Sequence, residues 1–311
     1  MIPGVDVSHW QVEIDWSEAK RAGVKFAFLK ATEFPDKKTT LYIDERLYEN
    51  IQGCAENGIY WSAYHFFRTH IDPIIQAQVF VETVGEFTSL PPVLDLEVAG
   101  SKGEKLNLKV QQFLTEVERL TNRKPIIYTS GGFWRSYMMY EKRVHADWAR
   151  EYPLWMAQYT TLWPTPLYPW AGWDFWQYSD KGTLPGFKTH MDLNWFNGSE
   201  EELVQRFNVG DGVYRLPAAV LASEEEAEDA LEAEETNAKM LEFESAKRVD
   251  LNYRGDFQEP MQASKRYFAS GRRPSGHMIP TGQPTAHSRM SAEERRWVRS
   301  YFIDKAVRQG G

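Results

Sequence analysis

The chain has 311 residues, of which 42% are hydrophobic, so it can build one large domain or two ordinary ones. A formal net charge of −8 argues against binding to nucleic acid through bulk electrostatics, and no nucleic acid partner is expected. The single cysteine, Cys54, excludes a disulfide within the chain, so the fold must be held together by packing.

Residues 1–210 alternate short apolar runs with amphipathic stretches. After a first strand that ends near Asp6, further strands are predicted at Val24–Ala31, Tyr60–Phe67, Pro92–Val98, Pro125–Ser130, Pro153–Tyr159, Trp173–Tyr178 and around Asp192. Helices are predicted at Ser17–Ala22, Leu41–Asn57, Pro73–Phe87, Leu108–Thr121 and Phe133–Met139. This alternation predicts an α/β fold, a modified (β/α) TIM-like barrel of about eight mostly parallel strands. Because little helix is predicted after Trp155, we expect the last strands to be irregular.

Residues 211–311 differ in composition and are predicted to form a helical and extended C-terminal extension. Ser223–Ser245 holds ten acidic residues and one basic residue, which is typical of a solvated helix. Asn252–Arg289 is broken by Gly and Pro, and Ser291 opens a capping box before a last, basic helix. Such a segment gains order mainly by binding a surface, so we expect it to attach to a protein partner or to another copy of the chain. The alternative is that it folds back on its own barrel.

Asp95 and Glu97 lie two residues apart in a predicted strand, so both carboxylates point to the same side. Glycoside hydrolysis commonly needs such a pair, in which one group is protonated and the other is ionised. Repulsion between the two can raise one pKa. The alternative is that the pair lies on a solvent-facing strand edge.

Asp6 and Asp192 lie near the ends of the first and last predicted strands. Residues at the carboxyl ends of barrel strands meet at one mouth, so these aspartates are expected to converge with Asp95 and Glu97. Taken alone, either aspartate could instead be a helix cap or a turn residue.

Eight blocks of the first 200 residues resemble glycoside hydrolase family 25, the Chalaropsis-type lysozymes, which include many phage endolysins. The blocks occur in the order GVDVSHWQ…IDW, FAFLKATE, AYHFF, PVLDLE, PIIYTS, LWMAQY, WDFWQYSD and MDLNWFNG. The resemblance implies cleavage of the β-1,4 bond from N-acetylmuramic acid to N-acetylglucosamine in peptidoglycan, with retention of configuration. It assigns the catalytic glutamate to Glu97, its partner to Asp95 and two further acidic positions to Asp6 and Asp192. It implies no metal and no cofactor.

Several aromatic and amide side chains at predicted strand ends are candidate sugar contacts or supports of the acids, with core packing as the alternative. They are Tyr64, Tyr128, Trp155, Gln158, Tyr159, Trp176 and Gln177. The spacing of His9, His65 and His190 matches no metal-ligand pattern, and we expect hydrogen-bonding roles for them.

These features predict a peptidoglycan muramidase, either a phage endolysin or a wall hydrolase carried on a virion. The other hypothesis is a structural or binding component of a larger particle that carries the barrel as a module. The four carboxylates favour the enzyme, because a decayed enzyme usually loses an acid. No signal peptide or membrane span is visible, so we expect the protein in the host cytoplasm before release, or on a virion, acting on the cell wall.

Overall fold

Nine strands form one sheet in the part of the chain that the computed structural model describes, residues 1–35, 39–87 and 89–209. Eight of them close into a barrel, because β1 pairs with β9 on one side and with β2 on the other. The barrel strands are β1 (Ile2–Val7), β2 (Phe26–Glu33), β4 (Tyr60–Phe66), β5 (Val93–Asp95), β6 (Ile126–Ser130), β7 (Leu154–Ala157), β8 (Phe175–Gly182) and β9 (Met191–Phe196). The predicted barrel is confirmed, whereas the extension predicted over 211–311 lies outside the described residues.

The direction of the last strand departs from the parallel pattern. Strands β1, β2 and β4 to β8 run parallel to one another, but β9 is antiparallel to both β8 and β1. A hairpin can join antiparallel strands without a helical crossover. The pairing of β8 with β9 also carries two register shifts, so the irregularity expected in the last strands is confirmed.

Both faces of the barrel strands are apolar, which explains their nearly continuous hydrophobic runs. Phe28 of β2 stacks on Trp155 of β7, with ring centroids 4.1 Å apart, although these strands are not neighbours in the sheet. Such a contact can occur only across the barrel interior. Phe28 and Trp155 belong to the interior cluster of buried apolar side chains. Ala27 and Leu29, which alternate with Phe28, belong instead to the outer apolar cluster, which includes helix residues such as Phe80 and Leu114.

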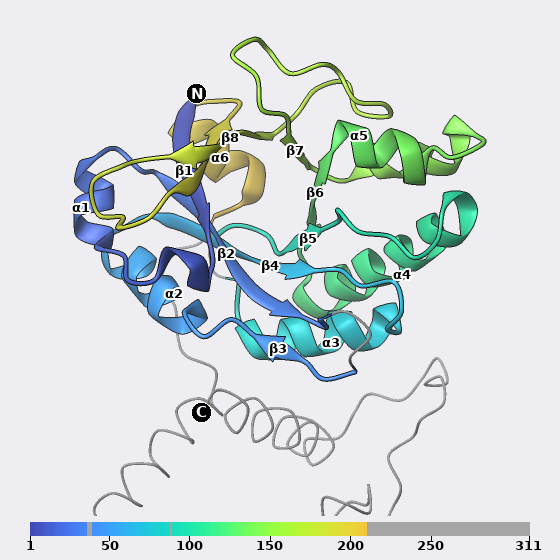
Figure 1. Cartoon of the computed structure of the whole chain (residues 1–311), viewed down its shortest axis with the longest axis horizontal. Helices are drawn as coiled ribbons and strands as arrows, with labels where there is room; N and C mark the ends of the chain where they lie inside the picture. Colours follow the sequence, from blue (N-terminus) through green and yellow to red (C-terminus); the bar gives the residue numbers. More distant parts are fainter. Residues whose placement is uncertain (36–38, 88, 210–311) are drawn as a thin grey trace, which may run out of the picture. The chain divides into compact units, whose positions relative to one another are not determined.

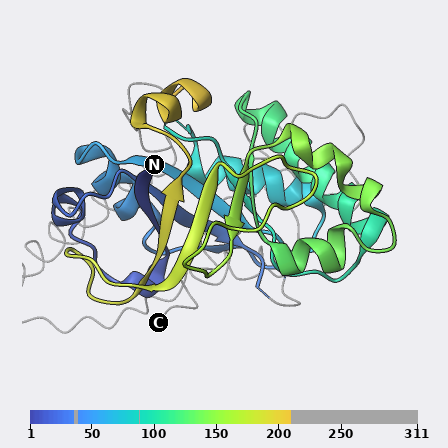
Figure 2. The same cartoon turned by 90° about the horizontal axis from the view of Figure 1, so that it is seen from above.

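Helices surround most of the barrel, as Figures 1 and 2 show. In Figure 1, α2, α3 and α4 lie along the lower side, whereas an irregular loop after β7 stands above the strands. The α-helices are α1 (Trp16–Arg21), α2 (Leu47–Glu56), α3 (Pro73–Val84), α4 (Gly103–Thr121), α5 (Gly131–Phe133) and α6 (Glu200–Phe207). The other helical segments are the 3-10 helices η1 (His9–Gln11) and η3 (Arg143–Glu151) and the π-helical η2 (Trp134–Met138).

Helix α6 closes one end of the barrel. Ser199 caps it in a capping box with Glu202, and Asn208 ends it in a left-handed conformation. Leu203 and Phe207 are buried in the interior cluster, and the Phe207 ring stacks on Phe175 at 5.4 Å. The opposite end, where the parallel strands finish, therefore remains available for a site.

Two predicted helices are wrong in part. The segment predicted as helix Leu41–Asn57 begins with a short strand, β3 (Tyr42–Ile43), which pairs with the end of β2. The buried Asp44 follows and accepts a hydrogen bond from the Arg46 backbone, so α2 begins only at Leu47. The helix predicted at Phe133–Met139 is α5 followed by the π-helical η2.

Candidate active site

The four predicted carboxylates converge at the mouth where the parallel strands end. Asp6 lies near the end of β1 and is the register partner of Asp192 on β9. Because β9 is antiparallel, Asp192 stands near the start of its strand, not near the end as predicted, and still reaches the same mouth. Asp6 and Glu97 both help to raise the pKa of Asp95, and Asp192 helps to raise that of Glu97, so the carboxylates influence one another directly.

Asp95 and Glu97 lie on the same side of the β5 segment but differ in their exposure to solvent. The predicted strand Pro92–Val98 is shorter in the structure and ends at Asp95, although the Leu96 backbone still donates to Tyr128. Leu94 and Leu96 both pack in the outer apolar cluster, so the alternation continues to Glu97. Asp95 is buried, whereas Glu97 is open to solvent at the mouth.

Asp95 carries an unsatisfied acceptor. Its side chain is only 5% exposed, and its Oδ1 atom has no hydrogen-bond partner among the described residues. Burial, together with the charges of Glu97 and Asp6, raises the pKa of Asp95 well above its usual range, against the opposing effect of Lys30. A buried oxygen without a partner is costly unless it serves a ligand or holds a proton.

Solvent reaches Glu97, but the surrounding protein displaces much of its hydration. This partial burial, aided by the negative charges of Asp192 and Glu33, raises the pKa of Glu97. The positive charges of Lys30 and Arg68 oppose the rise. Glu97 therefore tends to retain a proton to higher pH than an ordinary glutamate.

Two amide side chains hold Asp6. Its Oδ2 atom accepts hydrogen bonds from Gln177 Nε2 at 2.9 Å and from Asn194 Nδ2 at 2.7 Å. Gln177 Nε2 also donates to Asp192 Oδ2 at 3.3 Å. Burial and the charge of Asp192 raise the pKa of Asp6 well above normal, and the two carboxyl groups hydrogen-bond to each other. The Asp6–Asp192 pair is thus suited to share a proton.

The orientation of both amides is set by aromatic hydrogen-bond donors. Gln177 Oε1 accepts from the hydroxyls of Tyr128, at 2.9 Å, and Tyr159, at 3.1 Å. Asn194 Oδ1 accepts from Trp155 Nε1 at 2.7 Å. Sequence reasoning missed Asn194, although its position two residues after Asp192 places it on the same strand face.

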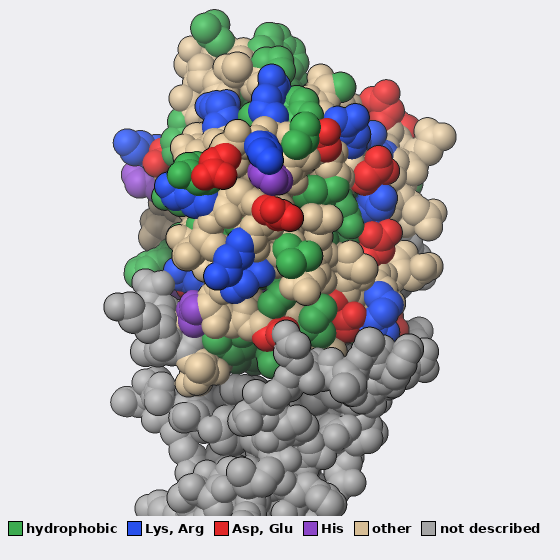
Figure 3. All heavy atoms as spheres, turned by 90° about the vertical axis from the view of Figure 1, so that its right-hand side faces the viewer, with side chains coloured by type: hydrophobic (Ala, Val, Ile, Leu, Met, Phe, Trp, Pro, Cys, Tyr) green, Lys and Arg blue, Asp and Glu red, His purple; other side chains and the backbone are tan. Residues whose placement is uncertain are grey.

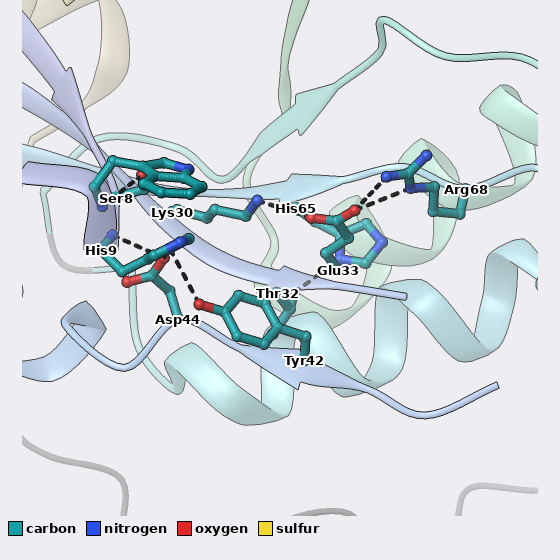
Figure 4. A network of polar contacts seen from close by, with 10 residues as sticks. Ser8, His9, Lys30, Thr32, Glu33, Tyr42, Asp44, His65 and Arg68 are labelled. Atoms are coloured by element: carbon teal, nitrogen blue, oxygen red, sulfur yellow. Dashed lines mark hydrogen bonds and ion pairs between the residues drawn. The ribbon is translucent and has the colours of Figure 1, made fainter. Parts of the chain in front are cut away.

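A fifth acid, Glu33 at the end of β2, lies between two cations, as Figure 4 shows. Lys30 Nζ is 2.8 Å from Glu33 Oε2, and Arg68 Nε donates to Oε1 at 3.1 Å. Burial opposes ionisation of Glu33, but these hydrogen bonds and charges keep its pKa below the usual value. Glu33 is therefore an anion that positions Lys30 and Arg68 near the mouth, and sequence reasoning did not single out these two cations.

The histidines have hydrogen-bonding roles, as expected. His65 is fully buried, and burial lowers its pKa to about 4, so it is neutral. Gln76 Nε2 donates to two carbonyls, which leaves Gln76 Oε1 as acceptor for His65 Nε2–H at 2.9 Å. His65 Nδ1 then accepts from Thr32 Oγ1 at 2.7 Å. His9 Nδ1 is 2.9 Å from Asp44 Oδ2, at the left of Figure 4.

The structure gives the predicted sugar contacts four different environments. Tyr159 is 56% exposed and Tyr64 is half-buried, so both can meet a ligand, and direct contact stays a prediction. Tyr128, Trp155 and Gln177 are buried and support the acids, while the buried Trp176 packs in an aromatic cluster. Gln158 accepts from the Thr165 backbone and so holds the loop after β7. Trp155 and Trp176 are only 2% and 7% exposed, which favours the packing alternative, and direct sugar contact by either residue stays a prediction.

Residues 1–35, 39–87 and 89–209 contain no group of three or more His, Cys, Asp or Glu side chains arranged to hold a metal ion. Within the same residues, no helix has the length and apolar character that crossing a membrane requires.

Comparisons with known proteins agree on one family. Residues 5–187 match the model of glycosyl hydrolases family 25, a range that ends before β9 and therefore before Asp192 and Asn194. The chain is 37% identical over 226 residues to protein YegX of Escherichia coli strain K12, covering 70% of this chain and 76% of that protein. It is 32% identical over 222 residues to Lysozyme M1 of Streptomyces globisporus, covering 67% and 71%. The crystal structure of the bacterial lysozyme from Streptomyces coelicolor superposes with a TM-score of 0.59 at 32% identity, covering 67% of this chain and 97% of that one.

Proposed function

Because the chain belongs to glycosyl hydrolases family 25 and is a glycoside hydrolase, we propose that it is a muramidase that cleaves peptidoglycan with retention of configuration. The bond cleaved is the β-1,4 bond from N-acetylmuramic acid to N-acetylglucosamine. The observation that carries the proposal is the pair at the end of β5, in which a solvent-open Glu97 with a raised pKa lies beside a buried Asp95 with a free oxygen.

Glu97 acts as the general acid and then as the general base. Its raised pKa keeps the proton available for the glycosidic oxygen, and its exposure lets water reach it in the second step. The charge of Glu97 is itself one cause of the raised Asp95 pKa, so the pair carries one proton more readily than none.

Asp95 stabilises the positive charge that develops at the anomeric carbon. That charge favours the Asp95 anion and leaves the proton on Glu97. The free Oδ1 atom of Asp95 can attack the sugar as a nucleophile, or it can accept a hydrogen bond from the N-acetyl group and orient it for attack. Both routes retain configuration.

The test uses purified cell walls. The proposal expects loss of turbidity and soluble fragments whose new reducing ends are N-acetylmuramic acid, identified by mass spectrometry after borohydride reduction. Proton NMR during the reaction should show the β-anomer first. New reducing ends of N-acetylglucosamine, an α-anomer as first product, or intact walls would each contradict it.

Asp192 should set part of the pH dependence. Its negative charge helps to raise the pKa of Glu97, so Asp192→Asn should lower that pKa. The general acid works only when protonated, and the alkaline limb of the activity profile should therefore move to lower pH. Asp192→Glu keeps the charge and serves as the control. An alkaline limb that stays in place in Asp192→Asn would refute this role.

For delivery, we propose that residues 211–311 attach the enzyme to a protein partner or to a second copy, and that the enzyme reaches the wall as a phage endolysin or on a virion. The composition of this segment supports the proposal, with its acidic, Gly/Pro-broken and basic aromatic parts.

Truncation after Val209 tests the attachment role and keeps α6, whose Phe207 fills the barrel interior. The shortened protein should melt cooperatively and clear walls as before. It should no longer bind its partner particle or associate with itself, as measured by light scattering. If truncation unfolds the barrel, measured by circular dichroism, the attachment role is wrong.

A further inference from the structure

The loop between β7 and β8 is anchored although it contains no helix. Trp170 is buried against Trp134, with ring centroids 4.6 Å apart, and its Nε1 donates to the Tyr152 carbonyl at 2.8 Å. At the other end, Gln158 accepts from the Thr165 backbone, and its own carbonyl accepts from Trp176 Nε1 at 2.8 Å. The segment between these anchors is therefore held in one position.

Three large side chains of this segment are nevertheless open to solvent. Tyr159, Leu162 and Trp163 are 56%, 75% and 67% exposed. The Trp163 ring stands near Trp173, at 5.7 Å, and near Trp176, at 6.5 Å and 29°. These contacts orient the indole without covering it. We call Tyr159, Leu162 and Trp163 the aromatic lip.

The aromatic lip is continuous with the catalytic mouth. The Tyr159 hydroxyl donates to Gln177 Oε1, and Gln177 Nε2 donates to Asp6. A single amide thus separates the lip from the carboxylates. Figure 1 shows the loop standing above the end of β7, on the side of the barrel that lacks α2, α3 and α4.

We propose that the aromatic lip is a binding site for sugar rings of the glycan strand beyond the bond that is cleaved. This inference rests on the proposed function. The C–H face of a pyranose ring covers the free face of Trp163, and the methyl groups of N-acetyl or lactyl substituents pack on Leu162. The hydroxyls of Tyr159 and Thr161 offer polar partners at the rim.

A glycan suits this surface better than a protein. Stable protein interfaces bury about 1,200–2,000 Å² in total, far more than three side chains supply. A sugar needs only a rigid apolar face with polar neighbours, and the orientation of Trp163 is already set. The site therefore predicts a preference for long glycan strands.

The test compares Trp163→Ala with the unaltered full-length protein on two soluble substrates, a long uncrosslinked glycan strand and a fragment of two disaccharide units. The value of kcat/KM should fall about tenfold on the long strand and clearly less on the fragment, as loss of one covered indole face predicts. In a Glu97→Gln background, sedimentation with insoluble peptidoglycan should show an affinity about tenfold weaker.

Two variants serve as controls. Trp163→Phe keeps a flat ring and should recover most of the binding, whereas Leu108→Ala removes an exposed apolar side chain of α4 and should change nothing. The site would be overturned by equal losses on both substrates or by no loss. It would also be overturned by a lower melting temperature that explains the loss, or by dissociation of an oligomer in ultracentrifugation. If the unaltered protein neither binds nor cleaves peptidoglycan, the proposed function itself fails.

Discussion

Glu97→Gln should lower turnover on purified cell walls by about 10² to 10⁴, because general acid–base assistance typically supplies that factor. The amide keeps the size and polarity of the side chain but cannot donate the proton or accept it back. Burial and the charge of Asp192 raise the pKa of Glu97, so the carboxyl group is already adapted to hold that proton. Turbidity loss gives the rate, and the melting temperature shows that the fold is intact.

The matched control is Glu104→Gln, an exposed glutamate in the first turn of α4 that should retain full activity. Near wild-type activity in Glu97→Gln would remove Glu97 from the mechanism. A comparable loss in the control would instead point to a general effect on the fold or on wall binding.

Asp95→Asn should give a more stable and much less active protein. The buried carboxyl has a raised pKa, so the folded state opposes its ionisation. Near neutral pH, this opposition destabilises the folded state relative to the unfolded state. A neutral amide removes this opposition, and each kcal/mol gained should raise the melting temperature by roughly 2–4 °C. Turnover should fall by about 10² or more, because the charge that faces the anomeric carbon is lost.

The pH dependence identifies the cause. Below the unfolded pKa of about 3.9, Asp95 is protonated in both states, so the variant and the wild type should melt alike. As the pH rises toward the folded pKa, the wild type should lose stability relative to Asp95→Asn, and the gap should then level off. A gap that is constant across this range, or a destabilised variant at pH 7, would show that ionisation of Asp95 is not opposed in the fold.

The sequence predicts the carboxylates well because their positions follow from local rules. Alternation along β5 places Asp95 and Glu97 on one side, and the rule that barrel strands end at one mouth brings in Asp6. The same rules failed for the direction of β9, since a strand carries no local mark of whether its neighbours run parallel. Asp192 reached the mouth for a reason other than the one expected.

The supporting residues were harder to find because they depend on contacts distant in sequence. Asn194 matters only through Asp6 and Trp155, and Trp163 is prominent only because the loop anchors leave it exposed. Trp155 and Trp176 are of a residue type that often contacts sugars. Their burial, however, depends on packing against Phe28 across the barrel and against Trp173, which the sequence does not reveal. The distribution of surface charge gives no indication of a binding site on the face in Figure 3, because basic and acidic side chains are interspersed there.

The position of β9 between β1 and β8 has a consequence for biosynthesis. Asp6 emerges from the ribosome with β1, yet the Asn194 amide that holds it follows 188 residues later. Strand β1 can pair with β2 early, but its other edge must wait until nearly the whole barrel has been translated. Contacts so far apart in sequence slow folding. A nascent or prematurely terminated chain that lacks β9 has an open barrel and an incomplete acid cluster, so the ability to cut the wall should arise only once residues up to about Phe207 are in place.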